Sequence, residues 1–229
     1  MAEPIRIISS MATRPVLADL LAQFEAATGQ RVLLEAVGGV DAAKRVQAGE
    51  AFDAVVLAAN VIEQLIGAGH IVAGSRADLV RSGVAIAVRA GAARPDIGSE
   101  ETVKRAVLGA GSLSYSTGPS GVHLAKLFER WGIADQIKGR IVQAPPGVPV
   151  GSLVAKGEVE LGFQQLSELM HLAGIDVLGP LPPEIQIVTT FSAGLSVTST
   201  QPDAVRRLFA FLVSPAAAAT KQNNGMEAA

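Results

Sequence analysis

Residues 5–37, IRIISSMATRPVLADLLAQFEAATGQRVLLEAV, contain a strand, a helix and a second strand in succession. The apolar run Ile5–Ile8 predicts a buried strand, and from Pro15 to Thr28 the apolar side chains recur at the three- and four-residue intervals of a helix. Gly29 ends this helix, and Val32–Val37 is apolar again. Two strands joined by a crossover helix run parallel, so this stretch predicts an α/β fold.

The alternation of strands and helices continues in two blocks. The first block adds the predicted helices Val40–Ala48 and Val61–Ile66 and the strands Ala54–Leu57 and Val84–Val88. After a connection at residues 91–98, the second block has helices at Glu101–Leu108, Gly121–Trp131 and Gly151–Lys156 and strands at Leu113–Ser116, Ile141–Gln143 and Leu161–Phe163. The prediction ends with an extended segment at Ile185–Thr190, helices at Ala204–Val213 and Ala216–Ala219, and a fraying tail at residues 222–225.

The composition excludes several classes of protein. With 229 residues, of which 49% are hydrophobic and 17% charged, the chain can bury a sizeable core in one large or two small globular domains. A net charge of −2 without basic clusters argues against binding to nucleic acid. The chain lacks cysteine, and His70, His123 and His171 lie far apart, so we expect no metal site. Nucleotide-binding, zinc and serine-hydrolase signatures are missing, and we expect no cofactor.

The sequence also bears on membranes and location. Glycine, proline and charged residues interrupt every apolar stretch, so direct insertion into a membrane is not expected. Residues Met1–Pro4 lead directly into the first strand without the pattern of a signal peptide, which indicates a cytoplasmic protein as the sequence stands. Ala2-Glu3-Pro4 would equally suit a periplasmic protein whose signal peptide has been removed. Both locations stay open.

The segment Ser114–His123, SYSTGPSGVH, joins a predicted strand to a helix through a loop rich in hydroxyl groups and glycine. Ser116, Thr117 and Ser120 offer hydroxyl donors, and Gly121 allows the backbone to approach a ligand closely. The exposed N–H groups at the start of the helix favour an anion, and His123 follows Ser120 by three residues, on the same helical face. Alternatively, these residues form only a turn and a helix cap.

Other strand ends have similar candidates. After the first strand come the hydroxyls of Ser9, Ser10 and Thr13, together with Arg14, which could bind a carboxylate in a bidentate manner or remain a solvated surface charge. The remaining candidate ligand-binding residues are polar side chains or backbone N–H groups at loops, where the alternative is an ordinary tight turn: Gly38, Gly39, Val40, Asn60, Pro149, Gln164 and Gln165. Parallel strands would bring several of these loops to one sheet edge.

Across nearly its whole length the chain resembles the periplasmic molybdate-binding proteins of the type II solute-binding fold. The resemblance rests on Pro15–Gly29, Gly39–Gly49, Phe52–Val56, Pro119-Ser120-Gly121 and Gly162–Gln165. It implies a two-lobed α/β fold with two mixed, mostly parallel sheets and a ligand cleft between the lobes. Residues 1–82 and 187–229 would form the first lobe and residues 83–186 the second. It further implies hinge closure over the ligand, a monomeric state and, for an exported protein, an ABC transporter permease as partner.

The resemblance is weaker at the ligand. Family members that hold molybdate have serine where Gly39 stands here, and a tyrosine near Gln165. Together with Arg14 and the amide of Gln164 or Gln165, these differences favour a di- or tricarboxylate over molybdate. A bacterial aconitate isomerase is similar to the same family, which implies an alternative: an intracellular isomerase or tautomerase of unsaturated polycarboxylates, with His123 as the proton-transferring base. A third hypothesis is a cytoplasmic module that reports an anion to a partner.

Overall fold

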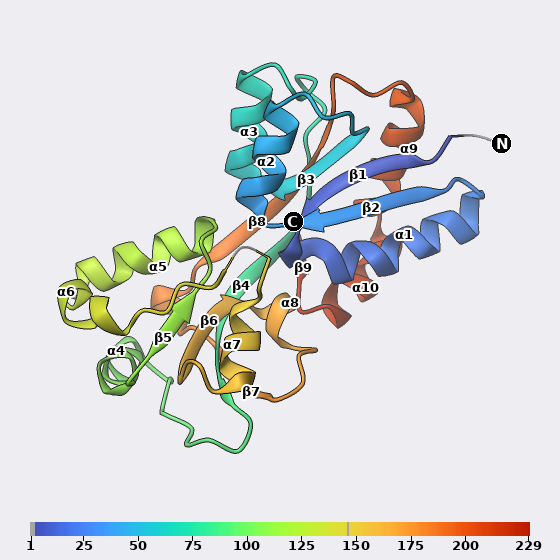
Figure 1. The fold of residues 1–229 in the computed structure, drawn as a ribbon. Coiled ribbons are helices and arrows are strands. Elements are labelled where there is room, and N and C mark those ends of the chain that lie inside the picture. The colour runs from blue at the N-terminus through green and yellow to red at the C-terminus, as the bar shows by residue number, and fades with distance from the viewer. Residues whose placement is uncertain (1–2, 146) are drawn as a thin grey trace. The chain divides into compact units, whose positions relative to one another are not determined.

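The computed structural model describes residues 3–145 and 147–229. Met1 and Ala2, on which the expectation about the N-terminus depends, lie outside the described residues. The chain divides into two compact units: unit 1 consists of residues 1–82 and 190–229, and unit 2 of residues 83–189. The chain crosses from unit 1 to unit 2 within strand β4 (Ala77–Arg89) and returns within β8 (Val188–Leu195), three residues after the predicted second boundary (Figure 1).

Unit 1 is built on a sheet with the strand order β2-β1-β3-β8. Strand β1 (Ile5–Ser10) pairs in parallel with both β2 (Val32–Val37) and β3 (Ala54–Ala58), as the opening stretch of sequence predicts. Strand β8 runs antiparallel to β3, which makes the sheet mixed. The short strand β9 (Glu227–Ala228) pairs with β4 at Val80 and Arg81.

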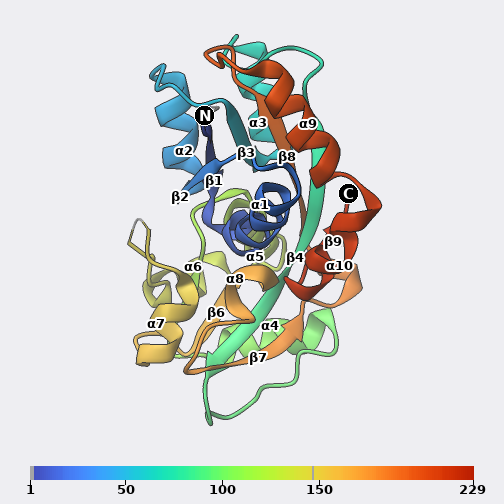
Figure 2. The same ribbon diagram turned by 90° about the vertical axis from the view of Figure 1, so that its right-hand side faces the viewer.

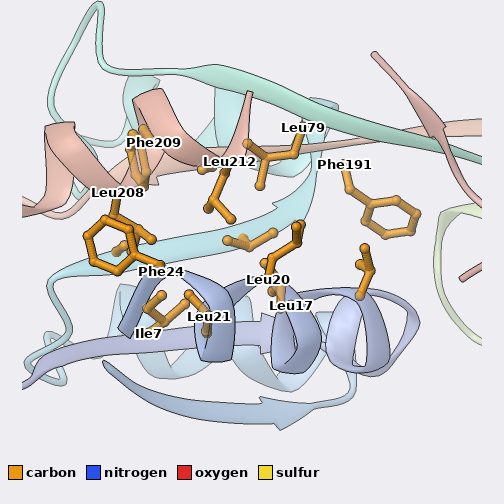
Figure 3. Packing of buried hydrophobic residues seen from close by; sticks show 14 of the residues in the cluster. Ile7, Leu17, Leu20, Leu21, Phe24, Leu79, Phe191, Leu208, Phe209 and Leu212 are labelled. Atoms are coloured by element: carbon orange, nitrogen blue, oxygen red, sulfur yellow. The ribbon is translucent and has the colours of Figure 1, made fainter. Parts of the chain in front are cut away.

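Helices cover both faces of the unit 1 sheet, because successive residues of each buried strand point to opposite faces. On one face, Ile7 packs with α1 (Arg14–Thr28) and α9 (Pro202–Leu212), and α10 (Ala218–Asn223) also contacts α1 (Figure 2). Figure 3 shows Leu17, Leu20 and Phe24 of α1 directed toward α9 in this cluster. On the other face, Ile8 packs with α2 (Gly39–Gln47) and α3 (Ala59–Gly67). Two short 3-10 helices, η1 (Met11–Thr13) and η4 (Pro215–Ala217), precede α1 and α10.

Unit 2 has its own mixed sheet. Strand β5 (Leu113–Tyr115) runs parallel to β6 (Leu161–Gln165), and β4 pairs antiparallel with both β6 and β7 (Ile175–Pro180). The helices on one face surround a cluster containing Phe128 and Phe163, and these helices are α4 (Glu100–Gly109), α5 (Pro119–Arg130) and α6 (Ala134–Ile137). The other face carries α7 (Val150–Lys156) and α8 (Leu166–Leu169), which both contact β6. The short helices η2 (Lys138–Arg140) and η3 (Pro183–Ile185) lie in connections.

The structure corrects the prediction in several segments. The tail at residues 222–225 is folded: Asn224 is buried and donates a hydrogen bond to Asp19 Oδ2, and the burial of Met226 in the α1–α9 cluster holds the chain end in place. The predicted strand at Ile141–Gln143 is reduced to one bridge, between Leu113 and Ile141. The predicted extended segment Ile185–Thr190 becomes a strand only from Val188. The sequence did not predict β7, because that strand is only partly buried and ends in Gly179-Pro180.

Candidate functional site

The carboxyl ends of β1, β2 and β3 lie along one edge of the unit 1 sheet, because the three strands are parallel. Each strand leads directly into a helix there, and all the candidate residues predicted for this unit stand at these junctions. The register pairs Ser9 with Ala36 and Val56, so the three strands end at a similar level. At this edge, henceforth the unit 1 edge, a side-chain carbon added to Gly39 would lie 3.7 Å from Cβ of Ser10.

The three hydroxyl groups of the unit 1 edge are buried and partly satisfied by their own loop. Ser9 Oγ and Thr13 Oγ1 each donate a hydrogen bond to the carbonyl oxygen of Ser10, at 3.2 Å. Ser10 Oγ lies 3.4 Å from Thr13 Oγ1, which is a long contact for two hydroxyl groups. Ser10 is therefore the hydroxyl whose proton can turn most readily toward a ligand.

Arg14 is exposed at the first turn of α1. Among the described residues it has no hydrogen bond or ion pair, in contrast to Arg45 and Arg76, which each bind two carboxylates. A cation is unfavourable at a helix N-terminus, where the backbone N–H groups already carry partial positive charge. An anion bound there would offset this cost.

The other predicted residues of unit 1 contribute mainly through the backbone. Gly38 caps α2, and Val40 follows in its first turn with a side chain that is 47% exposed. Asn60 is exposed at the start of α3, and its amide has no hydrogen bond within the described part of the chain. These positions present N–H groups or an amide at the same edge as Ser10 and Arg14.

Unit 2 has a corresponding edge, where the parallel strands β5 and β6 end. The register pairs Tyr115 with Phe163, so the loop after β5 and the junction after β6 lie side by side. Ser116 Oγ and Ser120 Oγ share a hydrogen bond of 3.1 Å across this loop. A Cβ at Gly121 would lie 1.6 Å from the carbonyl oxygen of Ser116, so only glycine permits this close approach. Thr117 is exposed in the same loop.

Gln164 joins the start of α7 to the unit 2 edge. The backbone N–H of Gly151, two residues after the capping residue Pro149, donates to Gln164 Oε1 at 3.2 Å. The Nε2 group of the same amide donates to Glu168 Oε2 at 2.7 Å. Gln164 is buried, so its two bonds fix the orientation of its amide.

Two other buried polar atoms stand at or next to this edge without a partner in the described residues. Gln165 donates through Nε2 to Thr189 Oγ1, whereas its Oε1 has no hydrogen bond. The hydroxyl of Ser114, in β5, also has none. Buried polar atoms are seldom left unpaired, and those near an edge of polar loops indicate a place for further donors and acceptors.

Glu168 is a residue that the sequence interpretation missed. It lies in α8, three residues beyond the end of β6, and forms one hydrogen bond and no ion pair among the described residues. Burial raises the pKa of its carboxyl to about 7, and the hydrogen bond from Gln164 offsets only part of that effect. The available signal was a single carboxylate between Leu166 and Leu169 in an otherwise uncharged stretch.

His123 lies on α5 but at the boundary of its buried face. Ser120 and Leu124 are buried, whereas Val122 and His123 are exposed. The imidazole has no hydrogen bond or ion pair in the part of the chain that the structure describes. The same-face relation predicted from the spacing therefore does not bring His123 into contact with the hydroxyl pair.

Three further observations concern the rest of the described chain. A hollow of about 480 Å³ in unit 2 lies at the amino end of β6, beside Leu161 and Glu160, and contains none of the predicted residues. Among the described residues, no three His, Asp or Glu side chains lie close enough to hold a metal ion. In the same part of the chain, we find no helix with the length and apolar character needed to cross a membrane.

Comparison with known proteins gives consistent matches. The family model described as bacterial extracellular solute-binding protein matches residues 5–227. An aconitate isomerase of Pseudomonas sp. is 34% identical over 237 residues, which cover 99% of this chain and 89% of the relative. A periplasmic molybdate-binding protein of Azotobacter vinelandii has a TM-score of 0.81 at 19% identity, covering 97% of this chain and 98% of that one. An ABC-transporter substrate-binding protein from Agrobacterium tumefaciens has a TM-score of 0.72 at 12% identity, covering 99% and 80%.

Proposed function

The chain belongs to the bacterial extracellular solute-binding protein family, and from that premise we propose that it binds a small di- or tricarboxylate. The observation that supports this ligand class best is Arg14, an exposed guanidinium without a partner among the described residues, four residues after Ser10 at the same sheet edge. A guanidinium matches a carboxylate in a bidentate geometry, which a compact tetrahedral oxyanion does not require.

Each edge has its own set of donors for an anion. The unit 1 edge offers Arg14, the Ser10 hydroxyl and the backbone N–H groups at Gly39 and Val40. The unit 2 edge offers the Ser116 and Ser120 hydroxyls and the Gln165 amide. A ligand with two or three carboxylates has enough oxygen atoms to accept several hydrogen bonds from the donors of one edge.

The second candidate function is isomerisation of an unsaturated polycarboxylate. It is favoured by the relative named aconitate isomerase, which matches nearly the whole chain at 34% identity. In such a reaction a proton leaves a methylene carbon next to a carbon–carbon double bond, the electron pairs shift by one bond, and a proton returns to the former alkene carbon. No atom is gained or lost, and the protein needs only a group that accepts and returns a proton.

In the binding role, we propose an ABC transporter permease as the partner that would receive the anion, in keeping with the Agrobacterium tumefaciens structure. In the isomerase role, no partner beyond the small molecule is required. The two roles use the same edges and differ in whether the bound ligand leaves changed.

A ligand screen tests the binding proposal. A ligand that binds only the folded protein raises its thermal stability, and the rise grows with ligand concentration. We expect trans-aconitate, tricarballylate or succinate to raise the melting temperature at micromolar to millimolar concentrations, and molybdate, sulfate and phosphate to have less effect. Stabilisation by micromolar molybdate without any effect of the carboxylates would refute the proposed ligand class. Incubation of trans-aconitate with the protein, followed by NMR, then separates binding from isomerisation.

A further inference from the structure

We propose that Glu168 is the proton-transfer residue of this site, accepting a proton from the methylene carbon of a bound unsaturated polycarboxylate and returning it to the far carbon of the double bond. The inference rests on the second candidate function above. It assigns the chemistry to the unit 2 edge and to a carboxyl group, in place of the exposed imidazole of His123.

The position of Glu168 supports this role. Its carboxyl group follows β6 at the same edge as the Ser116–Ser120 hydroxyl pair, because β5 and β6 are parallel and in register. A hydrogen bond to Oε2 from Gln164 Nε2 fixes the carboxyl group, and Gln164 is held in turn by the N–H of Gly151. The reacting group is thus attached to two elements of the unit, β6 and α7.

The hydrogen-bond pattern lets Glu168 hold or release a proton without rearrangement. Gln164 donates to Oε2, and a carboxyl oxygen can accept that bond whether the acid is ionised or neutral. Oε1 has no partner in the described residues and is the oxygen from which a proton would move. Since burial raises the pKa of Glu168 to about 7, both forms are populated near neutral pH, as a group that both takes and gives a proton requires.

Among the described residues, no charged group contributes to the shift in the pKa of Glu168. The main elements that pack on α8 are β6 and β7. β6 has no ionisable residue, and the single one in β7, Asp176, accepts a hydrogen bond from the N–H of Gly91 and lies 3.9 Å from Arg94. Strand β4 shows how far Asp176 lies from the end of β6: Asp176 pairs with Val88, whereas Gln165 pairs with Val84. Asp176 is therefore four residues along the sheet from Gln165. α7, behind β6, has Lys156 at its last turn as its single ionisable residue.

Next to Glu168 along the chain, the buried Oε1 of Gln165 is an acceptor without a donor in the described residues. The intermediate formed when the methylene proton leaves is a delocalised carbanion whose charge spreads onto a substrate carboxylate. A substrate carboxyl that binds in its protonated form would donate its O–H to Gln165 Oε1. The hydroxyl pair Ser116 and Ser120 can donate to the carboxylate oxygens, which stabilises the same charge.

The experiment follows exchange of the substrate's methylene protons with solvent. The intact protein is mixed with trans-aconitate in D2O, and deuterium entering the methylene group is followed by proton NMR, while a thermal-shift titration of the same samples reports binding. We expect Glu168→Gln to keep the thermal shift and to lose exchange by about 100-fold or more. Glu129→Gln, an equivalent change at an exposed position of α5, should keep exchange within about twofold of the wild type.

The outcomes separate the inference from the function on which it rests. Exchange by Glu168→Gln at the wild-type rate overturns the inference. Wild-type protein that binds trans-aconitate with neither exchange nor isomerisation also overturns it, and the binding function then stands. No thermal shift of the wild type with any carboxylate overturns the binding proposal itself. If Glu168→Gln no longer binds, the pH dependence of exchange decides. An inflection near pH 7 in the wild type, with exchange partly restored in Glu168→Asp, supports the inference. A rate of exchange that does not change with pH overturns it.

Discussion

The edges of the two units have the same architecture and opposite chemistry. In both, parallel strands end at loops that lead into helices and present hydroxyl and N–H groups. The unit 1 edge has an exposed cation, Arg14, without a partner in the described residues, and its buried hydroxyls bond within their own loop. The unit 2 edge has a half-buried carboxyl, Glu168, and the Oε1 of Gln165, which has no partner in the described residues. The unit 1 edge thus has a free cation and the unit 2 edge a titratable acid.

The edges also differ in how tightly their loops are packed. At the start of α2, a Cβ on Gly39 would meet Ser10 Cβ at an ordinary contact distance of 3.7 Å. At the start of α5, a Cβ on Gly121 would lie 1.6 Å from a backbone oxygen, which cannot move without displacing β5 or α5. The loop of the unit 2 edge therefore cannot accept a side chain at Gly121 without a shift of the backbone, whereas the unit 1 edge can accept one at Gly39.

The prediction with the largest expected effect tests this difference in packing. Gly121→Ala should lower the free energy of unfolding by about 3 kcal/mol, because the helix must shift away from Ser116. Gly39→Ala, the matched change at the other edge, should alter it by less than about 1 kcal/mol. Denaturant unfolding of both variants measures the effect. Equal destabilisation of the two would show that the loops are packed alike.

The pH dependence of stability tests the buried carboxyl. Because the pKa of Glu168 is about 7 in the folded protein against 4.5 ordinarily, the folded state binds its proton more tightly. The associated stability is fully present below pH 4.5 and is lost as the pH rises through 7, by about 3 kcal/mol at most. Glu168→Gln cannot ionise, so its unfolding free energy should lack this decline. Parallel curves for the two proteins between pH 4.5 and 8 would contradict the raised pKa.

The charge at the other edge is tested by Arg14→Ala. Loss of a charge-assisted hydrogen bond to a ligand costs about 1.5 kcal/mol or more, so carboxylate affinity should fall roughly tenfold or more, with little change in the stability of the free protein. Titration calorimetry with a stabilising carboxylate measures the change. Arg207→Ala, at an exposed arginine of α9 without a partner in the described residues, is the control and should bind normally. Equal affinity of both variants would remove Arg14 from the site.

The sequence predicted the parts of this comparison that depend on local pattern. Periodicity identifies β1 and α1 in the opening stretch, and the parallel rule places Ser10, Gly39 and Asn60 at one edge. The role of Gly121 as a close-approach position follows from its place in a loop rich in glycine. These inferences need only neighbours along the chain and the handedness of strand–helix connections.

The properties of Glu168 depend on residues distant in sequence and could not be predicted. Its raised pKa results from burial under elements that pack on α8, and the sequence pattern gives no measure of that burial. The same holds for Gln164, whose bond to Gly151 joins residues 13 apart. His123 shows the converse: its spacing from Ser120 is helical, but the boundary of the buried face falls between them. The folded tail at Asn224 was missed because its partner, Asp19, is 205 residues away.

The prediction with the smallest expected effect tests whether the unit 1 edge can bind a different anion. Molybdate-binding proteins, which the chain resembles, have serine at the position of Gly39, and the 3.7 Å clearance to Ser10 leaves space for that side chain. Gly39→Ser should therefore fold normally and gain one hydroxyl donor, worth about 1 kcal/mol, or roughly a fivefold gain in molybdate affinity by calorimetry. Gly39→Ala adds the side-chain carbon without the hydroxyl, and it should show no gain in molybdate affinity. An unchanged molybdate affinity in Gly39→Ser would mean that the unit 1 edge does not decide between anions, so the choice would rest with unit 2, where Gln165 stands near the tyrosine position of those proteins.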